Sequence, residues 1–263
     1  MARQHTLAIA DHRQVTPRLR WLALHAADLA RDVRPGHALL VWCNDPDDPY
    51  RLLRRPLFVA GALPELGQVA LLYEPDEPGL AWLARRLPGD ALNTIGLCGR
   101  ALHIAPHQRN LLLIGAGAGL AALICVARIA SAHTAVTLIA LAGDQAGLPP
   151  SFLLPSAVEY ETMVSADLNA TLAAALQPST GTSPLMWADA VIAALPREAT
   201  PTLAQAIRSV RLRLPRGFAH ILIELLPGCG FGACGVCAVD LRGGVRLPCV
   251  EGPWFDLRDG EGT

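Results

Sequence analysis

The sequence predicts an α+β protein of several domains: an antiparallel β-barrel, then a doubly wound α/β domain, then a small cysteine-rich module. Three successive textures along the 263 residues support this prediction. Short apolar runs separated by turn residues come first, a strand, glycine turn, helix and strand pattern follows, and a Cys- and Gly-rich stretch ends the chain. We therefore expect domains at residues 1–105, 106–222 and 223–263.

The first domain shows four apolar runs of strand length, HALLVWCN, RRPLFVAGAL, QVALLYE and ALNTIGLCG. Gly, Pro, Asn and Asp residues bound these runs, and this spacing is typical of strands in a small barrel or sandwich. One helix-like segment, Gly79 to Leu87, interrupts them.

The second domain begins with an apolar strand at residues 110–114, a glycine turn and an alanine-rich helix to about Ala132. Another apolar strand is expected at 135–142. Strands buried on both faces and joined through helices indicate a parallel sheet. Later runs at 187–194 and 219–226 predict further strands, with a helix at 202–210 between them.

The segment from Leu111 to Ala127 is uncharged, but it is shorter than the ~20 residues that a membrane-spanning helix needs. Its alternate glycines favour a buried strand that turns into a helix over a membrane span. The first residues contain no apolar stretch of signal-peptide length, so we expect a cytoplasmic protein.

Charge excludes several classes of function. The chain carries 22 basic and 23 acidic residues, a net charge of −1, and this balance lacks the basic footprint of a nucleic-acid-binding protein. Every basic residue is arginine. Without lysine, neither a P-loop nor Schiff-base chemistry is available.

Four cysteines, Cys229, Cys234, Cys237 and Cys249, follow the spacing C-x4-C-x2-C-x11-C. Disulfides would suit a secreted chain, and structural zinc sites usually pair two short knuckles. Three ligands on one tight loop with a distant fourth is the spacing of plant-type [2Fe-2S] sites. The pattern favours that cluster, with zinc and reduced structural cysteines as the alternatives.

The run GCGFGACGVCAVDLRGGVRLPCVEGPWFD resembles the C-terminal cluster module of the electron-transfer subunits of type B dihydroorotate dehydrogenases. These subunits belong to the ferredoxin-NADP reductase superfamily. The resemblance implies an FAD-binding β-barrel, an NAD-binding α/β domain and a [2Fe-2S] module, in the same order as the three textures. It also implies that the four cysteines are the cluster ligands.

On the flavin side, the stretch Arg55-Pro56-Leu57-Phe58 is similar to the family motif Arg-Pro-(Ile/Leu)-Ser, which contacts the flavin. Phe58 stands where the family has a hydroxyl. An ordinary strand with solvated arginines is the alternative interpretation.

The family then has a strand followed by a Gly-Thr pair at the flavin pyrophosphate. The matching residues here are Leu72, Tyr73 and Glu74 on the strand and Gly79 at the start of the helix. Glu74, Asp76 and Glu77 place negative charge where a pyrophosphate would lie.

On the nicotinamide side, Gly115, Gly117 and Gly119 resemble the family's glycine-rich turn, which implies NAD as a further cofactor. A tight packing turn between strand and helix would explain these glycines equally well. The family's Cys-Gly-Pro is replaced by Ala194-Leu195-Pro196, of which only the proline matches.

Two functions follow. In the first, the chain passes electrons between NAD(H), FAD, the cluster and a partner protein. The resemblance implies that this partner is a dihydroorotate dehydrogenase catalytic subunit of pyrimidine biosynthesis; another redox flavoprotein is the alternative. In the second, the chain is an adaptor whose nucleotide sites are empty. We expect Phe231, Trp254 and Phe255 to supply apolar contact with the partner, although Trp254 could equally pack the module internally.

Overall fold

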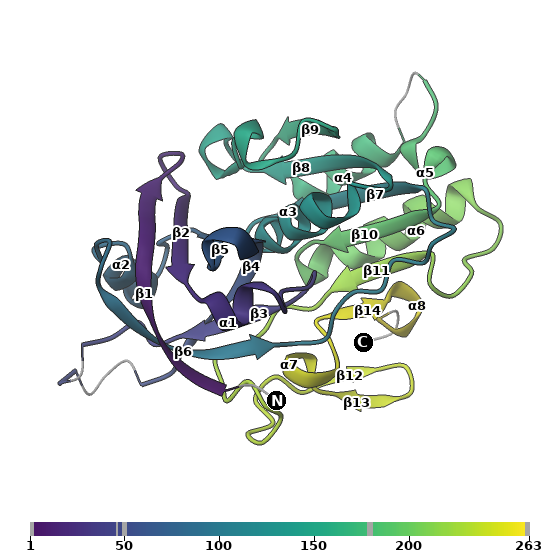
Figure 1. Cartoon of the computed structure of the whole chain (residues 1–263). Helices are drawn as coiled ribbons and strands as arrows, with labels where there is room; N and C mark the ends of the chain where they lie inside the picture. The colour runs from purple at the N-terminus through teal and green to yellow at the C-terminus, as the bar shows by residue number, and fades with distance from the viewer. Residues whose placement is uncertain (1–2, 46, 49–51, 178–180, 261–263) are drawn as a thin grey trace.

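A computed structural model describes residues 3–45, 47–48, 52–177 and 181–260. Its N-terminal half is a closed barrel with strand order β1-β2-β5-β4-β3-β6, in which all neighbours are antiparallel (Figure 1). The expected barrel is confirmed. Its strands are β1 Arg3–Gln14, β2 Arg20–His25, β3 Ala38–Val41, β4 Arg55–Leu63, β5 Gln68–Tyr73 and β6 Ala91–Cys98. Its helices are α1 Ala27–Ala30, the 3-10 turn η1 Pro64–Leu66 and α2 Pro78–Leu83.

Alternation of side chains builds the barrel core. Alternate residues of β6 are buried, and Leu22, Leu39 and Leu71 from three other strands are completely enclosed. Strands β1 and β2 were not among the four expected runs. Most residues of β1 are polar, and only Leu7 and Ile9 of that strand are buried. The helix expected to reach Leu87 ends at Leu83.

The second half is a six-stranded sheet of order β14-β11-β10-β7-β8-β9, parallel except for β14. Helix α3 covers one face, and α4 and α6 cover the other, so the doubly wound prediction is confirmed (Figure 1). The strands are β7 Asn110–Ala116, β8 Ala135–Ala142, β9 Val158–Val164, β10 Ala190–Ala194, β11 Ala219–Leu222 and β14 Trp254–Asp256. The helices are α3 Gly119–Ala130, α4 Leu168–Leu176, α5 Pro184–Trp187 and α6 Thr200–Val210, with 3-10 turns η2 Gln145–Gly147, η3 Ser151–Leu153 and η4 Arg197–Ala199.

Two expected strands are shorter than predicted. In the run 187–194, Trp187 is the last residue of the helical turn α5, and β10 begins only at Ala190. Helix α5 begins at Pro184, where the Ser183 hydroxyl accepts a hydrogen bond from the Leu185 N–H at 3.2 Å. The run 219–226 leaves the sheet after Leu222. The apolar segment from 111 to 127 forms β7 and α3 as expected, and none of the described helices has both the length and the apolar character to cross a membrane.

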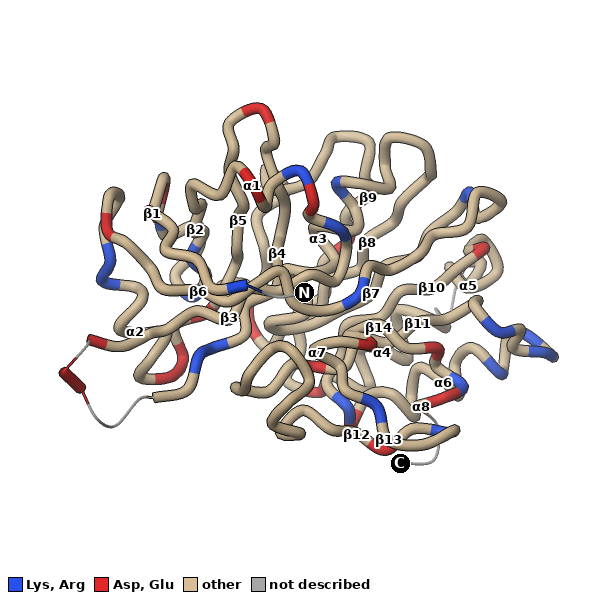
Figure 2. The backbone as a smooth tube through the Cα atoms, turned by 60° about the horizontal axis from the view of Figure 1, so that its bottom comes forward, with Lys and Arg blue, Asp and Glu red and all other residues tan. Residues whose placement is uncertain are grey.

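The C-terminal residues form the hairpin β12 Val239–Leu241 and β13 Gly244–Arg246, then α7 Pro248–Glu251, β14 and α8 Leu257–Gly260. Strand β14 pairs with β11, and the Gly99 N–H donates to the Cys249 carbonyl at 2.9 Å. The module therefore packs against both the end of β6 and the sheet edge (Figure 1). Acidic and basic residues are spread over the molecule, and basic residues gather at the end of α6 and just after it (Figure 2). Arg208 lies in the last turn of α6, and Arg211, Arg213 and Arg216 follow the helix.

Candidate functional site

The four spaced cysteines come together as two pairs. The Sγ atoms of Cys237 and Cys249 are 3.3 Å apart although twelve positions separate them. Cys229 and Cys234 form the other pair, because Cys234 hydrogen-bonds to the Cys229 sulfur. No three His, Cys, Asp or Glu side chains of the described residues are placed to hold one metal ion. Two pairs of thiols suit a cluster of two irons with four cysteine ligands better than a single zinc.

The backbone of the cysteine loop, residues 229–237, also suits an anionic, sulfur-rich group. Gly230, Gly232 and Gly235 have φ angles of 77°, 82° and 70°, a region that favours glycine. The loop therefore turns its amides toward Cys229, and the Ala233 N–H donates to the Cys229 sulfur at 3.3 Å. Burial opposes ionisation, but backbone N–H groups outweigh it and lower the pKa of Cys229 to about 7.

A fifth thiol lies beside this loop. A Cβ added to Gly230 would lie 2.7 Å from the Sγ of Cys98, at the end of β6. Burial raises the pKa of Cys98 to about 12, so it is a neutral thiol in the free protein. The spacing in the sequence gave no signal for Cys98, because its neighbourhood depends on how β6 packs against the module.

Arg55 and Gly79, two of the residues that the resemblance assigns to the flavin, lie next to each other around the Glu77 carboxylate. Arg55 donates from Nη2 to Glu77 Oε2 at 3.0 Å and from Nε to Oε1 at 3.1 Å. The same carboxylate accepts from the N–H groups of Gly79 at 2.9 Å and Leu80 at 2.6 Å. A Cβ on Gly79 would come within 2.7 Å of Arg55 Nε, so a side chain there would displace the guanidinium from its present position. These donors fit one oxygen-bearing anion, and the Glu77 carboxylate fills that position.

The other residues expected at the flavin have different surroundings. Phe58 and Leu72 are buried in the same hydrophobic cluster. The Tyr73 hydroxyl lies 2.9 Å from His12 Nε2, and Glu74 pairs with Arg18 at 2.5 Å. Pro56 and Leu57 follow Arg55 on β4.

The glycine loop has two kinds of glycine. A Cβ on Gly115 would lie 2.9 Å from the Ala194 carbonyl, and one on Gly119 would lie 2.7 Å from the Ala194 Cβ. Gly115 on β7 and Gly119 on α3 therefore both allow close packing against Ala194 of β10. Gly117 has φ of 60° and faces open space. It lies at the carboxyl end of β7, where the strand order reverses and ligands of doubly wound sheets bind.

Comparison with known proteins relates the geometry to a family. Residues 227–259 match the iron-sulfur cluster binding domain of dihydroorotate dehydrogenase B. The chain is 27% identical over 260 residues to the dihydroorotate dehydrogenase B (NAD(+)) electron transfer subunit of Geobacillus kaustophilus, with 97% of each chain covered. It is also 27% identical over 248 residues to the subunit of the same name from Desulforamulus reducens, with 92% of each covered. The chain is a relative of these electron-transfer subunits.

The resemblance expected from the C-terminal run is therefore confirmed. Among solved structures, an NADH-dependent reduced ferredoxin-NADP oxidoreductase superposes with a TM-score of 0.78, 18% identity and coverage of 97% of this chain and 89% of that one. A siderophore utilization protein from T. fusca superposes with a TM-score of 0.63, 17% identity and coverage of 84% and 92%. These likenesses confirm the reductase-like fold.

In this relative of the electron-transfer subunits, exposed apolar side chains gather in the cysteine-rich region and the approach to it. Phe231 is 51% exposed, and four other large apolar residues there are about as exposed: Leu226, Val236, Val245 and Val250. Trp254, which had two open interpretations, is 8% exposed and packs in the core. Phe255 packs on Gly252 instead.

Proposed function

We propose that this chain is the electron-transfer subunit of a type B dihydroorotate dehydrogenase, an oxidoreductase subunit that passes electrons between NAD(H), FAD, a [2Fe-2S] cluster and a catalytic subunit. The pairing of four cysteines within residues 227–259, the segment that matches the family's cluster domain, carries the proposal. The relatives' printed names and the reductase-like fold support it.

In this proposal Cys229, Cys234, Cys237 and Cys249 ligate the cluster. The loop's N–H groups favour the thiolate at Cys229, the form that binds metal. The protein would act in the cytoplasm, where such thiols stay reduced until they take up iron.

Arg55 and the first N–H groups of α2 would hold the flavin pyrophosphate, and Gly117 would allow the nicotinamide dinucleotide to approach the backbone. A pyrophosphate on those donors would displace the Glu77 carboxylate, which now accepts their hydrogen bonds. The flavin supplies the exchange between the paired electrons of a nicotinamide and the single electrons of a cluster.

The partner would dock on the exposed apolar residues around the cysteine loop. Phe231 stands on the loop itself, between two ligand candidates, and aromatic residues are enriched in interfaces. Docking there would bring the cluster toward the cofactor of a catalytic subunit.

The test is anaerobic purification of the wild type and of Cys234→Ser, with iron, sulfide and flavin quantified and the visible spectrum recorded. The wild type should contain two irons per chain, because four thiolates hold one [2Fe-2S] cluster. Its visible spectrum should also show flavin bands. Cys234→Ser should lose the cluster absorption, while Cys125→Ala, a buried cysteine on α3, should keep it.

Zinc without iron in the wild type would overturn the proposal. Cluster bands without flavin would favour a second function, an adaptor that relays electrons without a nucleotide cofactor. The observation that favours this alternative is the Glu77 carboxylate on the pyrophosphate donors.

A further inference from the structure

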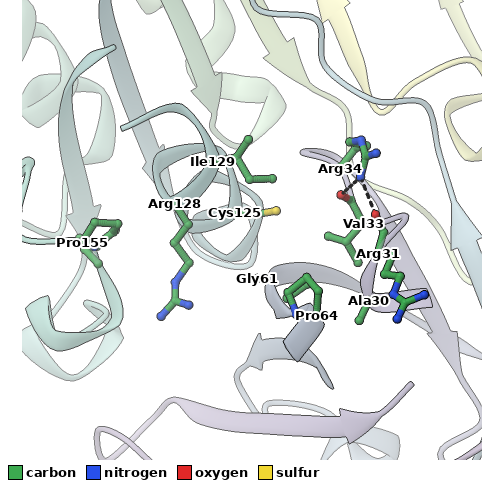
Figure 3. Close-up of a pocket in the computed structure, with 12 residues that line it drawn as sticks. Ala30, Arg31, Val33, Arg34, Gly61, Pro64, Cys125, Arg128, Ile129 and Pro155 are labelled. Carbon is green, nitrogen blue, oxygen red and sulfur yellow. Dashed lines mark hydrogen bonds between the residues drawn. The ribbon is translucent and has the colours of Figure 1, made fainter. Parts of the chain in front are cut away.

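A cavity of about 600 Å³ lies between the barrel and the α/β domain. Its barrel wall comes from α1, the following residues 31–34 and the end of β4, and its other wall comes from the last turn of α3 and residues 154–155 (Figure 3). The glycine loop lies at the opposite end of α3, and Arg55 at the opposite end of β4. The cavity is therefore separate from the proposed cofactor sites.

Three arginines line this cavity, and no carboxylate does. Arg128 stands on one wall, with Arg31 and Arg34 on the other (Figure 3). Arg34 is fixed by donating to the carbonyls of Arg31 at 2.9 Å and Val33 at 2.7 Å. Within the part of the chain that the structure describes, none of the three arginines has a carboxylate ion-pair partner.

Arg128 is the most constrained of the three. Its Nε donates to the Leu153 carbonyl at 3.0 Å, and its guanidinium stands 5.6 Å from the centre of the Trp21 ring. Its stem lies against Gly61, where a Cβ would be 3.1 Å from Arg128 Cδ. Burial lowers the pKa of Arg128, and no carboxylate among the described residues opposes that effect. A half-buried cation held this way is costly unless an anion joins it.

We propose that this cavity binds an organic anion, a carboxylate or phosphate group attached to a small apolar body. The guanidinium groups would bind the oxygens, since the planar fork of arginine matches both groups. Val33, Pro64 and Ile129 would contact the apolar body. The volume lies within the roughly 300–1,000 Å³ of small-molecule pockets. Because the walls belong to both domains, the bound anion bridges the barrel and α3.

Calorimetric titration of the purified full-length protein with phenyl phosphate and, separately, with benzoate tests this site and tells the two oxygen groups apart. At least one probe should bind the wild type. Arg128→Gln removes the central cation and should weaken binding about tenfold, the loss of one charge-assisted hydrogen bond.

Ile129→Glu should leave the protein folded, because Ile129 is 44% exposed. The new carboxylate competes with the ligand for the arginines. It too should weaken binding about tenfold or more. The matched controls Arg85→Gln and Leu87→Glu make the same chemical changes on exposed residues outside the cavity and should bind as the wild type does. Failure of both probes to bind, or unchanged binding in both cavity variants, would overturn the proposal.

Discussion

Glu77 shows how one side chain can take the position of a ligand. Its carboxylate caps α2 and accepts two hydrogen bonds from Arg55, so it satisfies the donors that we propose for the flavin pyrophosphate. Burial opposes ionisation, but Arg55 and the two N–H groups outweigh it and lower the pKa of Glu77 below its ordinary value. Glu77 is therefore a charged competitor at physiological pH.

Arg55→Ala should weaken FAD binding about tenfold to a hundredfold, since hydrogen bonds to charged groups contribute about 1.5–3 kcal/mol. Glu77→Gln should act in the opposite direction and tighten FAD binding, because it frees the Arg55 guanidinium. Titration of the apoprotein with FAD, monitored by the quenching of flavin fluorescence, measures the affinity of both variants. The control is Glu65→Gln on the exposed turn η1. Weaker binding by Glu77→Gln would mean that Glu77 orients Arg55 for the flavin.

His37 gives the fold a pH dependence. Burial first, and the nearby Arg34 second, lower the pKa of His37 to about 4, and its Nδ1 accepts the Arg34 N–H at 3.1 Å. The unfolded chain binds a proton at His37 below pH ~6.5, while the folded chain does not. The contribution of His37 to the free energy of unfolding is therefore fully present above that pH. It should fall by about 1–3 kcal/mol between pH 6.5 and 4.

Urea unfolding of the wild type and of His37→Asn at pH 5 and pH 7 checks this dependence. The variant should lose a large part of the difference between the two pH values, and the exposed His25→Asn should keep it. Equal pH slopes in wild type and His37→Asn would contradict the assignment.

At the scale of elements, close packing of β7 and α3 against β10 depends on glycine. Gly115→Ala and Gly119→Ala should each lower the free energy of unfolding by about 1–3 kcal/mol, because the added Cβ overpacks against Ala194 and, at Gly115, also against Leu123. Gly143→Ala, at the end of β8, should be nearly neutral, since nothing lies within 4 Å of its Cβ position. Thermal or urea unfolding of the three variants measures the effect. A large loss in Gly143→Ala alone would reverse this interpretation.

At the scale of the whole molecule, the module, barrel and sheet come together around the cysteines and leave the cysteine-rich region with an apolar surface. Phe231→Glu should weaken the complex with a co-expressed dihydroorotate dehydrogenase catalytic subunit at least about tenfold, because buried aromatic residues dominate interfaces. Leu212→Glu, on a fully exposed residue after α6, is the control. Size-exclusion chromatography and iron analysis measure association and cluster content separately. Intact association with normal iron in Phe231→Glu would place the interface elsewhere.

The sequence by itself determined the order of the three textures and the family likeness. Apolar periodicity distinguishes barrel strands from buried parallel strands, and the cysteine spacing reflects how a short loop can wrap a small group. These signals are local in the sequence, so they can be recognised without knowing how the elements pack. The cluster ligands and the domain boundaries at residues 105 and 222 stay predictions.

Only the tertiary structure decided which distant groups meet. Cys98 reaches the Gly230 loop because β6 ends there, Glu77 closes on Arg55 across 22 positions, and β14 completes the sheet at β11. Trp254 is buried for the same reason, since β14 carries it into the core. Such contacts depend on the packing of whole elements, and a single sequence records only the residues beside each other along the chain.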